Sequence, residues 1–153
     1  MRTHGGMIPF QPRPWEEIYA FLSNMADSHP EFAHMAAIAD SVIASGVAGQ
    51  LAGTTSMHDI LVVTAPPPGP PYDLIAVGAP GSMREPLPGH VIIEHRSCTG
   101  HNDCIERPVS DAVRLFWRFV ITKYGIQPNP PAPRGYERAI NVQLTTASGG
   151  PSR

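Results

Sequence analysis

The chain has 153 residues, of which 11 are Lys or Arg and 13 are Asp or Glu, and its formal net charge at pH 7 is −2. This length is enough for one domain with a substantial buried core. Non-specific nucleic-acid binding draws most of its energy from clustered cations. Because the Lys and Arg residues are spread singly along the chain, the composition argues against a nucleic-acid partner.

The apolar residues form no run of about 18 or more, the length that a membrane-spanning helix needs. Residues 1–10 contain one Arg and lack the apolar stretch of a signal peptide. The sequence therefore predicts a cytoplasmic protein that has no membrane partner.

The N-terminal part of the chain predicts two consecutive helices. In residues 14–27, apolar side chains recur at the spacing of one helix face, and Pro14 suits the first helical position. A second apolar stripe follows, which Gly46 can end in the left-handed conformation. The two stripes consist of Trp15, Ile18, Leu22 and Met25, and then of Phe32, Met35, Ile38, Ala39 and Val42. We expect these helices to form a hairpin or one kinked rod.

Four short segments in the middle of the chain predict β-strands; the first is β-branched and becomes apolar toward its end, and Pro108 ends the fourth. They cover residues 54–64, 73–78, 90–97 and 103–107. Proline-rich stretches at 66–71 and 80–89 mark connections between them, since proline lacks an N–H donor and fixes φ. Strands that follow one another without crossover helices favour an antiparallel sheet.

Residues 110–124 predict a strongly apolar helix. Asp111 near its start and Lys123 near its end complement the helix dipole, and Gly125 ends it. A helix this apolar must be largely covered by other elements. The fold class that we predict is therefore α+β: a short antiparallel β-sheet of four or five strands, with this helix packed on one face and the N-terminal helical pair at a side or end.

The single α+β domain is predicted to span residues 1–126, followed by a proline-rich tail at 127–153. Within the tail, residues 140–145 alternate between apolar and polar side chains, as an edge strand with one buried face does. Such a strand could pair within the chain or add to the sheet of a partner. The alternative is a disordered tail.

Four residues of types that bind soft metal ions, His95, Cys98, His101 and Cys104, occur at every third position. Zinc takes four His or Cys ligands in a tetrahedron, usually from paired knuckles such as CxxC or HxxxH. The spacing HxxCxxHxxC differs from these patterns. The residue types suggest zinc and their arrangement does not, so we expect no cofactor and keep zinc at these four residues as the alternative.

The segment that holds these four residues is predicted to be a hairpin. The expected cross-strand pairs are Cys98 with Cys104, Arg96 with Glu106, and His95 with Arg107. Because side chains alternate between the two faces of a strand, His95 then points away from both thiols, and one ion cannot bind all three. A disulfide between the cysteines fits this register, but in the cytosol we expect both thiols to stay reduced.

No segment has the context of a catalytic site, so no catalytic residue is predicted. Arg114 and Arg118 share one side of the last predicted helix, where they could bind the carboxylate of a partner. Glu94 and Arg96, in the third predicted strand, complete the candidate binding residues. An ordinary solvated or ion-paired surface is the competing interpretation of these charges.

The sequence leaves three functional hypotheses. The first is a small, non-catalytic intracellular interaction protein, immunity-like or an accessory binding protein, with an unidentified protein partner. The acidic character of residues 1–60 supports it, because they carry six Asp or Glu against two Arg. The second is a small metal- or thiol-dependent enzyme that uses the His and Cys residues of segment 90–104. The third is a structural subunit of a larger assembly, including a homo-oligomer.

Overall fold

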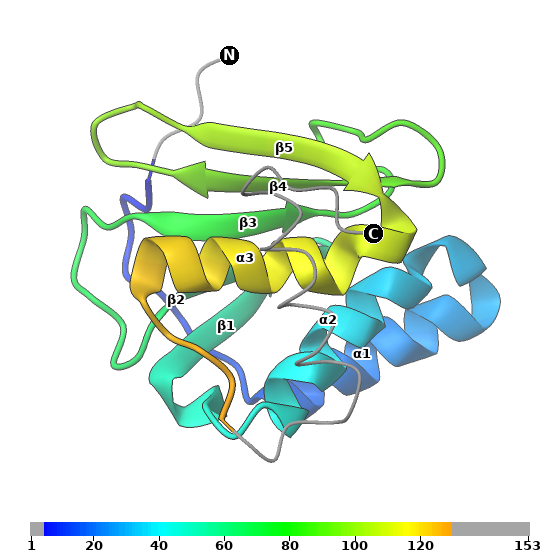
Figure 1. The fold of residues 1–153 in the computed structure, drawn as a ribbon, viewed down its shortest axis with the longest axis horizontal. Helices are drawn as coiled ribbons and strands as arrows, with labels where there is room; N and C mark the ends of the chain where they lie inside the picture. The colour runs from blue at the N-terminus through cyan, green and yellow to red at the C-terminus, as the bar shows by residue number, and fades with distance from the viewer. Residues whose placement is uncertain (1–4, 130–153) are drawn as a thin grey trace, which may run out of the picture.

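The computed structural model describes residues 5–129 of the chain. Its helices are α1 (Trp15–Ser28), α2 (Ala33–Ala44) and α3 (Ala112–Tyr124), with short 3₁₀ turns η1 (Pro30–Phe32), η2 (Ala48–Gln50) and η3 (Val109–Asp111). Its strands are β1 (Leu51–Ser56), β2 (Asp59–Thr64), β3 (Leu74–Gly78), β4 (His90–Arg96) and β5 (Asp103–Pro108). Figure 1 shows how these elements are arranged.

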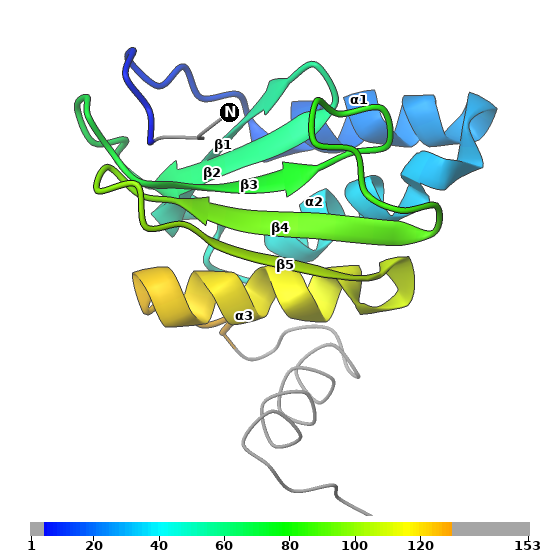
Figure 2. The same cartoon turned by 90° about the horizontal axis from the view of Figure 1, so that it is seen from above.

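The five strands of the described chain form one antiparallel sheet in the order β1-β2-β3-β4-β5. Helix α3 contacts β3, β4 and β5, and the antiparallel pair α1 and α2 lies beside it (Figure 1). Seen from above, α3 runs alongside β4 and β5 (Figure 2). The predicted α+β fold, with an antiparallel sheet, a covering helix and an N-terminal helical pair, is confirmed.

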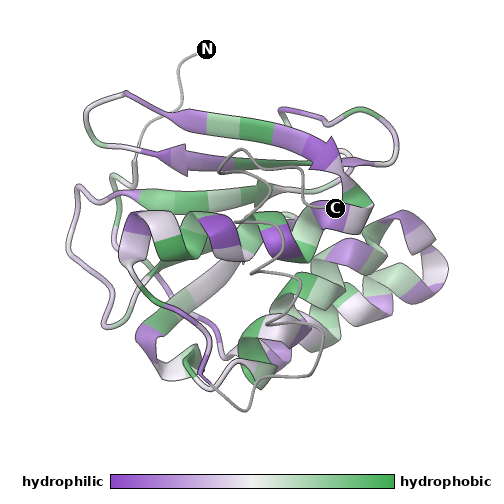
Figure 3. Ribbon diagram, in the orientation of Figure 1, coloured by the Kyte–Doolittle hydropathy of each residue, from purple (hydrophilic) through white to green (hydrophobic). Residues whose placement is uncertain are grey.

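The main core lies between the sheet and the three helices. Ile75 and Val77 of β3 point into it, while the alternate residues Leu74 and Ala76 join a smaller cluster on the other sheet face. Trp117 of α3 is fully buried in the main core. The hydropathy colouring shows both green apolar and purple polar residues along α3 (Figure 3), which agrees with a helix that buries an apolar side and keeps a polar one.

Helix α1 docks on the edge strand β1 through one aromatic side chain. The Trp15 indole N–H donates a hydrogen bond of 3.0 Å to the Leu51 carbonyl. A Cβ atom at Gly53 would lie 2.6 Å from the Trp15 ring, so this contact requires glycine at position 53. The Arg13 amide also donates a hydrogen bond of 2.8 Å to the Gly53 carbonyl. The segment that precedes α1 therefore lies along this edge of the sheet.

The prediction of one continuous strand over residues 54–64 is wrong. The segment is a hairpin in which Ser56 pairs with Asp59, and Met57 and His58 form the turn. Met57 has a φ of 56°, which is uncommon for a residue other than glycine. The turn carries none of the Gly, Asn or Pro residues that usually signal one, so the apolar pattern concealed it.

Helix α3 ends as predicted, with Gly125 in the left-handed conformation at φ 68°. After it the chain returns to the end of α2, where the Asn129 amide donates to the Ser45 carbonyl at 2.9 Å. The predicted strand at 140–145 lies outside the described residues. In residues 5–129, no helix has the length and apolar character needed to cross a membrane.

Candidate functional site

The hairpin of β4 and β5 has a different register from the predicted one. Glu94 pairs with Cys104 and His95 with Asp103, so the predicted pairing of Cys98 with Cys104 is wrong by four residues. The predicted pairs of Arg96 with Glu106 and of His95 with Arg107 fail for the same reason: Ile92 pairs with Glu106, and Val91 with Arg107. An even shift leaves the paired side chains on the faces that were expected. Cys98 is the exception, because it lies in the loop after β4 and lines one pocket together with His95, so the expectation that His95 points away from both thiols is wrong for Cys98.

The register differs because the chain turns two residues earlier than predicted: the loop covers residues 97–102 and is centred near Thr99 instead of His101. Side chains hold this loop open: the Ser97 amide donates to Asn102 Oδ1 at 2.8 Å, and the Cys98 amide donates to Asp73 Oδ1 at 2.8 Å. The Gly100 amide bonds the Ser97 carbonyl at 3.0 Å, with Gly100 at φ 83°. Such side-chain contacts are not visible in a pattern of apolar residues.

The four residues considered for zinc do not converge on one point, although His95 and Cys98 both lie beside Asp73 and line one pocket. His95 is buried beside Asp73, with 3.8 Å between His95 Nε2 and Asp73 Oδ2, while Cys98 and His101 lie exposed in the loop. Cys104 lies on β5 beside the Arg84 guanidinium. Within residues 5–129, no three His, Cys, Asp or Glu side chains gather in a way that could hold a metal ion.

The surroundings of both thiols raise their pKa. A hydrogen bond to the Asp73 carboxylate raises the pKa of the Cys98 thiol. The pKa of Cys104 is raised chiefly by its loss of hydration, although the Arg84 guanidinium opposes this effect. Because the thiolate is the reactive form, these surroundings disfavour thiol-dependent chemistry at neutral pH.

Protein purified without a His tag should contain zinc and iron at well below one ion per chain. The Cys98→Ser, Cys104→Ser double variant should have the same metal content, because the quartet does not gather around one point. Elemental analysis by plasma mass spectrometry measures both. Near-stoichiometric metal that disappears in the double variant would contradict this prediction and favour the enzyme hypothesis.

Glu94 and Arg96, two of the candidate binding residues, lie in an ion-pair cluster on the sheet face away from the helices. The Glu94 carboxylate is only 4 % exposed and accepts hydrogen bonds from Arg96 Nε at 3.1 Å and from Arg84 Nη1 at 3.3 Å. Arg84 belongs to the connection between β3 and β4, and no sequence pattern indicated it. The cluster holds this connection against the sheet and leaves Glu94 little room for a partner.

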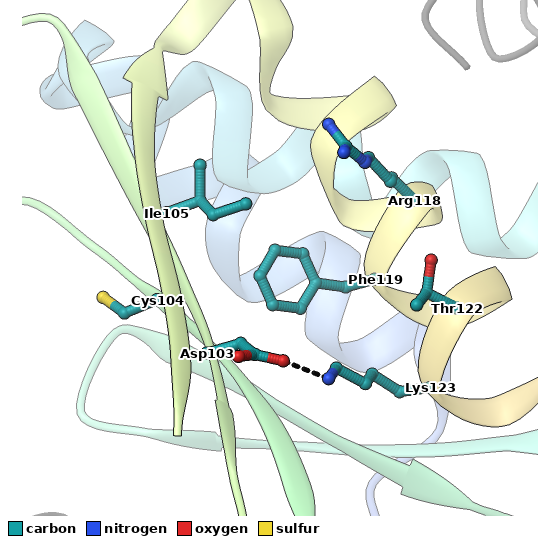
Figure 4. Close-up of a pocket in the computed structure, with 7 residues that line it drawn as sticks. All are labelled: Asp103, Cys104, Ile105, Arg118, Phe119, Thr122 and Lys123. Atoms are coloured by element: carbon teal, nitrogen blue, oxygen red, sulfur yellow. Dashed lines mark hydrogen bonds and ion pairs between the residues drawn. The ribbon is translucent and has the colours of Figure 1, made fainter. Parts of the chain in front are cut away.

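A groove of about 280 Å³ runs between β5 and α3. Its lining consists of Asp103, Cys104 and Ile105 from the strand, and of Arg118, Phe119, Thr122 and Lys123 from the helix. Figure 4 shows the Phe119 ring pointing from α3 toward the strand. The spacing of Phe119, Thr122 and Lys123 places them on one side of α3, but only the fold shows that this side meets β5.

The charges of the groove are unequally paired. At one end, Lys123 bonds the Asp103 carboxylate and lowers its pKa (Figure 4). Arg114, the other Arg of the predicted binding side, bonds Asp111 one turn earlier in the chain. Arg118 is partly exposed and forms no hydrogen bond or ion pair with the described residues. The groove therefore offers one guanidinium that is available to a ligand.

Strand β5 forms one edge of the sheet, and no described residue pairs with its outer side. The opposite edge is different, because the chain at Arg13 bonds β1. An edge strand with unpaired N–H and C=O groups is a surface on which another chain can add a strand. The open edge, the groove and Arg118 thus lie together on one side of the molecule. No protein-family model, curated protein or solved structure matches the chain.

Proposed function

We propose that this protein is a non-catalytic interaction protein, immunity-like or an accessory binding protein, that binds a protein partner at the groove between β5 and α3. The observation that carries the proposal is Arg118, whose guanidinium has no partner in the described chain and lies beside an open strand edge. A guanidinium binds a carboxylate through two parallel hydrogen bonds, which fixes direction as well as charge. The partner is therefore one that presents an acidic side chain.

The rest of the groove supports a protein partner in an extended conformation. Main-chain groups of an added strand would bond the outer side of β5, and its side chains would reach Ile105 and Phe119 on the apolar lining. The Lys123 ammonium is already held by Asp103, so Arg118 is the cation that selects the partner's charge. The Cys104 thiol points away from the groove toward Arg84 on the other face of the sheet, so it supplies no nucleophile there (Figure 4).

A photo-crosslinking residue at Thr122 should capture the partner from cells that contain the protein, whereas the same residue at Tyr19 should not. Thr122 lines the groove, and Tyr19 lies on α1, 37 % exposed. The captured protein is then produced separately and its affinity measured by calorimetry. Arg118→Gln should weaken binding about tenfold or more, because the partner's carboxylate loses its counter-ion on a desolvated surface.

Arg114→Gln is the matched control, because it removes the same charge from the same helix. It should change the affinity less than about twofold, since Arg114 is already paired with Asp111. Equal losses for the two variants would mean that only general charge attraction matters. Crosslinking at Tyr19 rather than at Thr122 would place the interface elsewhere, and a stable dimer linked through Thr122 would favour the structural-subunit hypothesis.

A further inference from the structure

A second pocket, of about 380 Å³, lies away from the groove, where the start of α2 faces the connection between β3 and β4. Its walls are mainly apolar and include Ala33, Pro86, Leu87, Pro88 and Val109. This volume is at the lower end of the range for ligand pockets, roughly 300–1,000 Å³, and suits a group of the size of one aromatic side chain. Prolines form much of the surface and leave few backbone N–H groups to bind a polar ligand.

One buried polar group of this pocket has no partner. His34 lines the pocket and is only 9 % exposed, and its Nε2 atom is buried without a hydrogen bond among the described residues. The backbone of Glu31 binds the ring, and burial lowers the pKa of His34 to about 4. The imidazole is therefore neutral at physiological pH. With its other nitrogen directed to a carbonyl, Nε2 carries a lone pair that lacks a donor.

We propose that this pocket binds the indole ring of a tryptophan side chain from a protein partner, with the indole N–H donating to His34 Nε2. Indole is a large apolar ring with one donor and no acceptor, which matches a mainly apolar pocket whose His34 Nε2 lacks a donor among the described residues. Glu31 and Glu85 at the pocket disfavour an anionic ligand. The inference rests on the proposed function in one respect, that the ring belongs to a protein partner. The pocket itself lies on a different surface from the groove between β5 and α3.

Nε2 is buried from solvent, so the ring must displace part of the pocket wall to bond it. Leu87 is suited to move. Its side chain is 62 % exposed and does not belong to either apolar cluster of the described chain. Its backbone is fixed by the Leu87 amide bonding Glu106 Oε2 at 2.8 Å and by the His90 amide bonding the Leu87 carbonyl at 2.9 Å. A change of the Leu87 rotamer can therefore open the pocket without moving the strands.

Titration of the full-length protein with indole, followed by two-dimensional NMR, tests the site. The amide signals of Ala33, Leu87 and Gly89 should shift and saturate at millimolar indole, the affinity expected for a fragment of this size. Benzofuran has nearly the same shape and lacks the N–H. It should bind about twofold to tenfold more weakly, which corresponds to the loss of one neutral hydrogen bond.

The His34→Leu variant should bind indole and benzofuran equally, because it keeps an apolar wall and removes the acceptor. His90→Leu is the matched control on the same pocket: His90 Nδ1 lies 3.1 Å from the Pro88 carbonyl, and this variant should keep the preference for indole. Equal binding of indole and benzofuran by the unmodified protein would overturn the proposal. So would an unchanged preference in a folded His34→Leu variant.

N-Acetyltryptophanamide tests the source of the ring, because it presents the indole on a peptide backbone. It should bind the same residues at least as tightly as indole; a pocket that takes indole and excludes this amide would contradict the assignment to a protein side chain. The Arg118→Gln variant should bind indole normally. Failure of the groove proposal would leave these indole titrations unchanged, so the two proposals can fail separately.

Discussion

Acidification from pH 7.5 to pH 4.5 should lower the free energy of unfolding by about 2–3 kcal/mol through His34 alone. The unfolded chain binds a proton at this residue near pH 6.5, but in the folded protein burial holds the pKa at about 4. Stability from His34 is therefore complete above pH 6.5 and is lost progressively as the pH falls toward 4. Urea unfolding at the two pH values measures the change.

Other groups also titrate in this range, so the His34→Leu variant serves as the reference. The difference in unfolding free energy between the unmodified protein and this variant should change by about 2–3 kcal/mol between the two pH values, since only the former can gain the proton. His90→Leu retains His34 and should follow the unmodified protein. Parallel pH profiles for the unmodified protein and His34→Leu would show that the imidazole is readily protonated in the folded state.

Replacement of Trp117 by Ala should lower the free energy of unfolding by about 3–5 kcal/mol, the usual cost of truncating a large buried aromatic residue. Trp117 is fully buried, contacts the Phe116 ring edge-on at 5.5 Å between centroids, and donates from its indole N–H to Ser41 Oγ at 2.9 Å. This one side chain thus joins α3 to α2. Denaturant unfolding followed by circular dichroism measures the loss.

Trp117→Phe separates packing from hydrogen bonding. It keeps most of the volume and should cost about 1–3 kcal/mol, since Ser41 Oγ still donates to the Ile38 carbonyl and is not left unsatisfied. Tyr19→Ala, on the exposed part of α1, is the control and should cost less than about 1 kcal/mol. A loss for Trp117→Ala no larger than that of Tyr19→Ala would contradict the packing of α3 on α2.

The helices and the sheet could be predicted because their signals are local. The apolar spacing in 110–124 and the glycine at 125 define α3 without reference to the rest of the chain. The hairpin of β1 and β2 was missed because Met57 and His58 are unusual turn residues, and tertiary packing overrides their preference. The register of β4 and β5 was missed because it depends on Asp73, which lies far away in the sequence.

The candidate site could be predicted only in part. Helical spacing predicted that Arg114 and Arg118 lie on the same side of α3. The sequence does not show that Arg114 pairs with Asp111, whereas Arg118 has no partner among the described residues. The groove itself forms between two elements whose contact is tertiary. No motif in the sequence marks His34, which is buried in the structure and lines a pocket with residues of the connection between β3 and β4.

The order of the strands has a consequence for synthesis. Every strand pair in the sheet joins neighbours in the chain, so each hairpin can close over a short loop at low entropic cost while the ribosome is still adding residues. The helix that covers β3, β4 and β5 comes after all of them. Until it is made, Ile75, Val77 and Ile93 face water on a finished sheet, and the nascent chain is at its most exposed to aggregation at that moment.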